Sequence, residues 1–229
     1  GPQAWAGHDK VRIVEGRKFA TGLREIEVGQ GAKGQFRDME VGRTLTLGNQ
    51  TPDQWGADRT PGAEKYSAGI VALDLATGKV RWNYQFTHHD LWDMDVGSQP
   101  TLLNLKTPDG IKPALIAPTK QGSLYVLDRR DGTPIVPIRE IPVPQGAVKG
   151  DHTAPTQARS DLNLLGPDLT EQAMWGATPF DQMLCRIQFR SLRYEGQYTP
   201  PSEQGSLVYP GNVGVFNWGS VSVDPVRQL

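Results

Sequence analysis

The sequence holds a single cysteine, Cys185, among its 229 residues, so neither a disulfide within the chain nor a cysteine-based metal site can form. No apolar run approaches the roughly 20 residues that a membrane-spanning helix needs, and the first residues lack the apolar stretch of a signal peptide. Excess positive charge is also missing, because 24 Lys and Arg face 25 Asp and Glu. Without a basic stripe, nucleic acid is not expected as a partner.

Glycine and proline, in contrast, are abundant, at 26 and 18 residues, which favours many turns and short strands. One pattern occurs twice, at residues 70–79 and 124–133: an apolar strand, then Asp, two variable residues, Thr or Asp, and Gly. Asp74 and Asp128 are 54 positions apart, a spacing typical of β-propeller blades. Each copy predicts a hairpin whose Asp accepts amide hydrogen bonds and whose Gly takes a positive φ. Residues 221–225 are expected to open a third copy, so the pattern favours an all-β propeller over a sandwich.

The repeat lapses between Pro137 and Gly205, where proline-rich sequence is followed by helical signals. Thr178 is expected to cap a helix that has Pro179 as its first residue and an acidic residue, Asp181, in its first turn. Apolar side chains then share one helical face: Phe180, Met183, Leu184 and Ile187. We therefore expect a loop and helix inserted at about 137–205, which would shape a site rather than build the core.

Three polar segments carry groups capable of chemistry. Residues 88–95 (HHDLWDMD) gather two imidazoles, three carboxylates and a tryptophan after a strand. On spacing alone, a metal cluster, an acid/base site and a solvated loop all remain open, and two imidazoles without a third spaced ligand are a weak zinc signal. Residues 48–56 are rich in side-chain oxygens that suit calcium or magnesium, but without EF-hand spacing. Lys120 lies between two strands, a position where most lysines are merely exposed.

Together and in order, eight segments resemble the membrane-bound quinoprotein glucose/quinate/shikimate dehydrogenases. These segments are GNQTPDQWG, ALDLATGKVRW, HHDLWDMD, APTKQGSLYVLDRRDG, PVPQGAVKGD, WGATPFDQ, RYEGQYTPPSEQG and YPGNVGVFNWGSVSVDP. The HD-x-W-D part is shared with quinoprotein alcohol dehydrogenases. The resemblance implies that residues 47–229 form part of an eight-bladed β-propeller, that residues 1–46 are a divergent segment without a structural assignment, and that the chain is a fragment. It further implies a periplasmic location, with an inner-membrane anchor outside this chain.

The resemblance also implies a cofactor, pyrroloquinoline quinone, and specific roles for residues. Asp93 matches the catalytic aspartate, and Lys120 and Thr51 match residues that contact the quinone. Asn49 matches a side-chain oxygen ligand of a divalent cation, calcium or magnesium. No role transfers to four neighbouring residues, which are expected only to shape the loop: His88, His89, Asp90 and Asp95. The chain departs from the family at residues 29–32, where a tryptophan that stacks on the quinone is expected.

The activity that these residues imply is oxidation of a sugar or cyclitol hydroxyl, either glucose to gluconolactone or quinate/shikimate. A carboxylate can take the hydroxyl proton while hydride leaves for the quinone, and an ammonium and a divalent cation stabilise the developing charge. Electrons would then pass to membrane ubiquinone. We expect the chain alone to be inactive. Two alternatives are a non-catalytic propeller used for binding or assembly and a zinc hydrolase built on His88 and His89. The retained Asp93, Lys120 and Thr51 favour the dehydrogenase.

Overall fold

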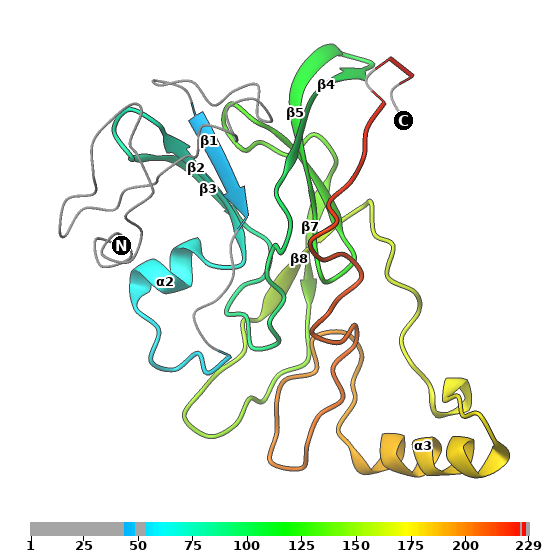
Figure 1. Cartoon of the computed structure of the whole chain (residues 1–229). Coiled ribbons are helices and arrows are strands. Elements are labelled where there is room, and N and C mark those ends of the chain that lie inside the picture. The colour runs from blue at the N-terminus through cyan, green and yellow to red at the C-terminus, as the bar shows by residue number, and fades with distance from the viewer. Residues whose placement is uncertain (1–43, 49–53, 225, 228–229) are drawn as a thin grey trace, which may run out of the picture. The chain divides into compact units, whose positions relative to one another are not determined.

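The computed structural model describes residues 44–48, 54–224 and 226–227. The chain divides into two compact units, one of which comprises residues 46–71 and 82–229, while the other includes 72–81; each is described by itself. Strands outnumber helices among the described elements (Figure 1). The elements are β1 (Thr44–Gly48), α2 (Pro61–Tyr66), β2 (Gly69–Asp74), β3 (Val80–Gln85), β4 (Thr101–Thr107), β5 (Gly110–Pro118), β6 (Leu124–Asp128), β7 (Ile138–Pro142), β8 (Thr156–Ser160), the 3-10 helix η2 (Glu171–Ala173) and α3 (Pro179–Ser191). None of the described helices is long and apolar enough to cross a membrane.

The strands form small sheets in chain order. β1, β2 and β3 are neighbours in one sheet, β4, β5 and β6 in a second, and β7 pairs with β8. In the second sheet, β4 and β5 are antiparallel from Thr101 opposite Ile116 to Thr107 opposite Gly110, and β6 pairs antiparallel on the other side of β5. Short antiparallel sheets joined by tight turns agree with the expected all-β class.

The repeated turn has the predicted chemistry in both copies. The Asp74 carboxylate accepts the amide of Thr77 at 2.9 Å, and Asp128 accepts the amide of Arg130 at 2.9 Å. The closing glycines, Gly78 and Gly132, have φ of 66° and 78°, values that only glycine adopts without strain. The interpretation of these segments as Asp/Gly turns is confirmed.

The second and third copies differ from a complete hairpin. After Gly132 the returning strand is reduced to a single bridge between Leu127 and Pro134, because proline has no amide to continue a ladder. In the third copy, Asp224 accepts the amides of Val226 and Arg227 at 2.9 and 3.1 Å, which repeats the turn. The structure assigns no strand to residues 221–224, the described part of that copy.

The largest buried cluster joins the second sheet to β8 and to the chain after β3. Phe86 and Tyr125 stack with ring centroids 3.8 Å apart, and both are fully buried. The Tyr125 hydroxyl donates to the carbonyl of Ala158 at 2.8 Å and accepts the amide of Gln121 at 3.2 Å. Because stacked aromatics bury large apolar areas and the hydroxyl is satisfied, this cluster fixes the three segments against one another.

Trp82 of β3 packs against the turn of the second copy. It also contacts the buried cluster, and a Cβ placed on Gly132 would lie 2.7 Å from its ring. The turn glycine of the second copy is therefore required twice, once for its φ and once for the close approach of this tryptophan.

Residues 137–205 hold more sheet than the sequence indicates. β7 and β8 lie within the expected loop, where prolines and charged residues hide the alternation of a strand. α3 is confirmed, with Thr178 and Asp181 forming a reciprocal capping box and Pro179 in the first turn. Its apolar face is exposed rather than packed, with Phe180 75% exposed, and Cys185 is half-buried.

Candidate functional site

The loop after β3 is shaped by a buried carboxylate, Asp90, which is 1% exposed. Its two oxygens accept the amides of Trp92 at 2.9 Å and Met94 at 2.8 Å. Burial raises the pKa of Asp90 to about 6, although these two hydrogen bonds act in the opposite direction. The local bonds bend the chain tightly between residues 90 and 94, as an Asx-type turn does.

This bend presents Asp93 to the outside. Its neighbours Trp92 and Met94 are 2% and 1% exposed, and the Trp92 indole donates to the carbonyl of Thr199 at 2.7 Å. Asp93 itself has φ of 64°, a left-handed conformation that aspartate tolerates better than most residues. With both neighbours anchored inward, its side chain keeps 34% of its surface exposed.

Lys120 lies in the turn between β5 and β6 and is only 6% exposed. The segment near the C-terminus covers it: Val215 donates its amide to the Lys120 carbonyl at 2.8 Å. Gly214, at φ 75°, lies so close that an added Cβ would be 2.5 Å from the Lys120 Cα. The backbone of this segment thus packs against Lys120 and fixes its position.

The loop and the turn bring Asp93 and Lys120 together. The Lys120 Nζ lies 2.9 Å from Asp93 Oδ2, and it also pairs with Asp95 Oδ1. Burial by itself lowers the pKa of Lys120, but hydrogen bonds and charge from Asp95 and Asp93 outweigh it and raise the pKa above its usual value. A lysine that is charged, buried and doubly paired is a fixed positive centre.

Three residues of this region were not assigned a site role from the sequence: Asp95, Asn217 and Trp218. Asp95 joins the lysine from two residues beyond Asp93, and a Cβ on Gly97 would lie 3.0 Å from Asn217 Oδ1 and 3.7 Å from Trp218. Trp218 is 86% exposed. Asn217 and Trp218 belong to the matched segment YPGNVGVFNWGSVSVDP, so the signal was present, but nothing local indicated that they approach the loop at residues 93–97.

The residues present fit a flat anionic quinone and a hard cation. A fixed ammonium suits quinone or carboxylate oxygens, and an exposed indole offers a face on which a ring can stack. Carboxylate and amide oxygens from Asp93, Asp95 and Asn217 are ligand types that calcium and magnesium prefer. Asn49 and Thr51, the other two predicted site residues, lie outside the described residues.

The adjacent histidines point to different partners. His88 lies between Gln85 and Glu140, with both ring nitrogens 3.0 Å from a side-chain oxygen. His89 instead contacts Glu64 and Asp151. A hydrolytic zinc site built on both imidazoles therefore has no support in this geometry.

Comparisons with known proteins identify the family of the chain. Residues 44–229 match the family model described as "PQQ: Glucose/ethanol/alcohol dehydrogenase, beta-propeller domain". A quinoprotein glucose dehydrogenase of Gluconobacter oxydans is 56% identical over 81% of this chain and 23% of that protein. One from Escherichia coli is 53% identical over 81% of this chain and 23% of its own length.

A quinate/shikimate dehydrogenase (quinone) of Acinetobacter baylyi is 44% identical over 80% of the chain and 23% of that protein. The chain thus spans about a quarter of the length of these relatives. Since the family model covers all of the chain from residue 44 onward, the chain belongs to the PQQ-dependent glucose/ethanol/alcohol dehydrogenase β-propeller family.

Proposed function

We propose that this chain supplies the catalytic carboxylate and a cofactor-binding lysine of a PQQ-dependent dehydrogenase that oxidises a sugar or cyclitol hydroxyl. The observation that carries the proposal is the 2.9 Å contact between Lys120 and the partly exposed Asp93. A base that is held in place yet reachable by a hydroxyl is what proton abstraction requires. Relatives named as glucose and quinate/shikimate dehydrogenases support a small polyol as the substrate class.

Each residue then has a defined task. Bound pyrroloquinoline quinone supplies the redox chemistry by accepting two electrons from the alcohol carbon. Asp93 accepts the hydroxyl proton on its exposed oxygen while Lys120 holds the carboxylate in one orientation. Asp95 keeps Lys120 charged and fixed, so the ammonium can stabilise negative charge on a bound ligand without reorganising. The buried Trp92 and Met94 exclude water from the inner side of the loop.

Several wider features belong to the same proposal. Residues 47–229 form part of an eight-bladed propeller and residues 1–46 a separate segment, while Thr51 contacts the quinone and Asn49 binds calcium or magnesium. The complete enzyme resides in the periplasm, anchored to the inner membrane, and passes electrons to ubiquinone. The relative named a quinate/shikimate dehydrogenase (quinone) supports a quinone as the electron acceptor.

A chimera tests the proposal directly. Residues 44–229 replace the matching segment of the Escherichia coli quinoprotein glucose dehydrogenase, and PQQ-dependent dye reduction is assayed with glucose and then quinate. Asp93→Asn should lower kcat by about 100-fold or more, the usual contribution of a positioned base. Lys112→Met, which removes an exposed lysine paired only with Asp109, is the control and should leave kcat unchanged.

Two outcomes would contradict the assignment. Full activity in Asp93→Asn would mean that another group removes the proton. A folded chimera without PQQ-dependent activity would favour the alternative of a non-catalytic binding or assembly propeller.

A further inference from the structure

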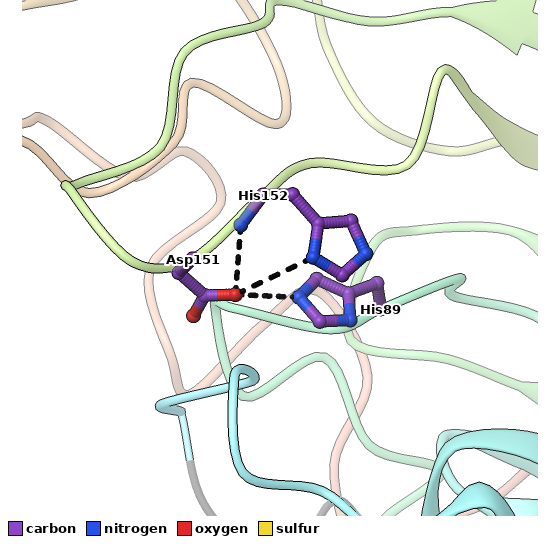
Figure 2. A group of neighbouring side chains, drawn as sticks. All are labelled: His89, Asp151 and His152. Carbon is purple, nitrogen blue, oxygen red and sulfur yellow. Dashed lines mark hydrogen bonds and ion pairs between the residues drawn. The ribbon is translucent and has the colours of Figure 1, made fainter.

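A second polar cluster surrounds His89, in the same loop as Asp93. His89 is 4% exposed and has φ of 44°, a left-handed backbone that is unfavourable for most residues. Its Nε2 lies 2.8 Å from Asp151 Oδ1, and the ring of His152 stacks on it with centroids 3.7 Å apart (Figure 2). Two segments distant in sequence thus meet at one buried imidazole.

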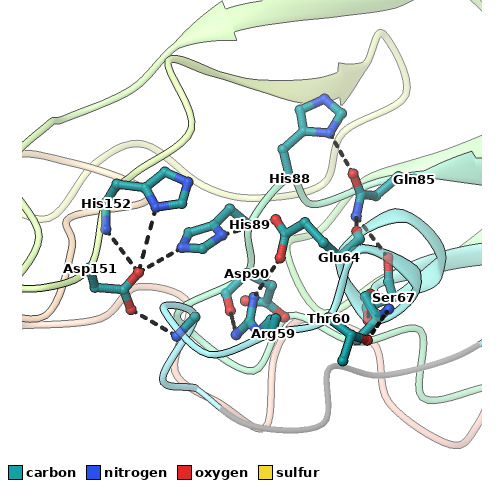
Figure 3. Close-up of polar contacts among 12 residues, drawn as sticks. Arg59, Thr60, Glu64, Ser67, Gln85, His88, His89, Asp90, Asp151 and His152 are labelled. Atoms are coloured by element: carbon teal, nitrogen blue, oxygen red, sulfur yellow. Dashed lines mark hydrogen bonds and ion pairs between the residues drawn. The ribbon is translucent and has the colours of Figure 1, made fainter.

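Both nitrogens of His89 face carboxylates. Nδ1 lies 2.9 Å from Glu64 Oε1 of α2, opposite the contact with Asp151 (Figure 3). A neutral imidazole carries one N–H and can satisfy only one of these two acceptors. The other nitrogen would then turn a lone pair toward a carboxylate oxygen at hydrogen-bond distance, which is repulsive unless a cation lies between them. That cation is either a second proton or a metal ion.

The surrounding geometry favours a metal ion. His89, Asp151 and His152 each offer one ligand atom, and these atoms lie within 4.8 Å of one another, close enough to share one metal ion. Tetrahedral zinc, with bonds of about 2.0–2.2 Å, places its ligand atoms roughly 3.3 Å apart. The observed separations from Asp151 Oδ1, 2.8 Å to His89 and 3.8 Å to His152, bracket that value. A second proton on His89 would account for its contact with Asp151, but not for the approach of His152 to the same carboxylate oxygen.

The outer contacts match those of protein zinc sites. Histidine ligands commonly donate their second N–H to a carboxylate, which fixes the tautomer and orients the ring, and Glu64 takes this position at Nδ1. Asp151 is oriented by the amide of Gly56, which donates to Oδ2 at 2.8 Å. A Cβ on Gly56 would lie 2.3 Å from His89 Nε2, so only glycine allows the backbone to approach the imidazole this closely.

The donor set indicates which ion fits. Two imidazole nitrogens and one carboxylate oxygen suit zinc and its transition-metal neighbours, whereas calcium and magnesium prefer oxygen ligands only. Glu64 and Asp151 carry negative charge, which Arg59, 3.8 Å from Glu64, balances in part. A divalent ion at this position therefore meets a net negative environment. His152 is 70% exposed, so the fourth position faces solvent.

We propose that His89, Asp151 and His152 bind one zinc ion in a structural site. The ion ties α2, through the Glu64–His89 contact, and the loop at residues 151–152 to the loop that presents Asp93. It does so without using the Asp93–Lys120 pair. It differs from a hydrolytic site on adjacent histidines because the third ligand comes from a segment 62 residues further along the chain and His88 takes no part.

Zinc titration of the 229-residue chain tests this site. The chain is stripped with a chelator, dialysed at about pH 7.5, where unbound imidazole is mostly neutral, and titrated with zinc chloride by calorimetry. We expect one zinc ion to bind and the thermal midpoint to rise with zinc concentration. His152→Phe keeps a ring stacked on His89 but removes Nδ1, and it should weaken zinc binding at least about 10-fold. Because His152 is exposed, this variant should fold.

The control is His88→Phe, which removes the adjacent histidine outside the cluster and should leave zinc affinity unchanged. Equal zinc affinity in His152→Phe and the unaltered chain would overturn the proposal, as would the absence of stoichiometric zinc binding. Calcium chloride that raises the thermal midpoint as much as zinc does, with a rise that His152→Phe abolishes, would also contradict it. These readouts need no dehydrogenase activity, so they stand or fall independently of the proposed function.

Discussion

Replacing Asp90 with asparagine removes a buried charge while keeping a side chain of the same shape. Burial raises the pKa of Asp90 from 3.8 to about 6. The folded chain therefore holds this proton more tightly than the unfolded chain. Its stabilising effect is complete below pH 4 and is lost as pH rises through 6. At 1.36 kcal/mol per pKa unit, the contribution of Asp90 to the unfolding free energy should fall by about 3 kcal/mol across this window, so the difference between the unaltered chain and the variant isolates it from other carboxyl groups.

Asparagine stays neutral over the whole range. Like the protonated acid it offers a carbonyl to one of the two amides, so both chains should unfold with similar free energies at pH 4. At pH 7 the variant should be the more stable by about 3 kcal/mol, because the unaltered chain has lost that much since pH 4 while asparagine does not titrate. In the chimera, however, the variant should lose activity, because the Asp90 bonds to the amides of Trp92 and Met94 shape the bend that presents Asp93.

The assay is urea unfolding from pH 4 to pH 7 with a chelator present, followed by tryptophan fluorescence, for which the buried Trp92 is a suitable probe. Asp109→Asn is the control, because the Asp109 side chain is 79% exposed, and this variant should retain the full fall with pH. Parallel stability curves for the unaltered chain and Asp90→Asn would refute the reasoning.

Two further substitutions test the packing. Tyr125→Phe removes the hydroxyl that donates to a backbone carbonyl of β8 and should lower the unfolding free energy by about 1–3 kcal/mol; no change in the urea midpoint would show that the buried bond contributes little. Gly214→Ala introduces a Cβ 2.5 Å from Lys120 at a positive φ and should destabilise the chain by more than about 1 kcal/mol and lower PQQ-dependent activity in the chimera. Gly211→Ala, where an added Cβ meets nothing within 4 Å, is the matched control, and equal effects of the two alanines would contradict the packing explanation.

Features held by short-range hydrogen bonds were predictable from the sequence. The Asp/Gly turns at Asp74 and Asp128 and the capping box at Thr178 join groups only a few residues apart, so residue type and spacing determine them. The same holds for the family, since the resemblance was read from matched segments and the family model covers residues 44–229.

Contacts between distant segments were decided only by the tertiary structure. The packing of the sheets and loops determines that Asp95 shares Lys120 with Asp93. It also determines that residues 151–152 complete a cluster with His89. The pairing of β7 with β8 and the exposure of the apolar face of α3 were likewise decided by the tertiary structure. The sequence contains all of these residues. It does not give the distance between positions tens of residues apart, because the packing of the whole chain sets that distance.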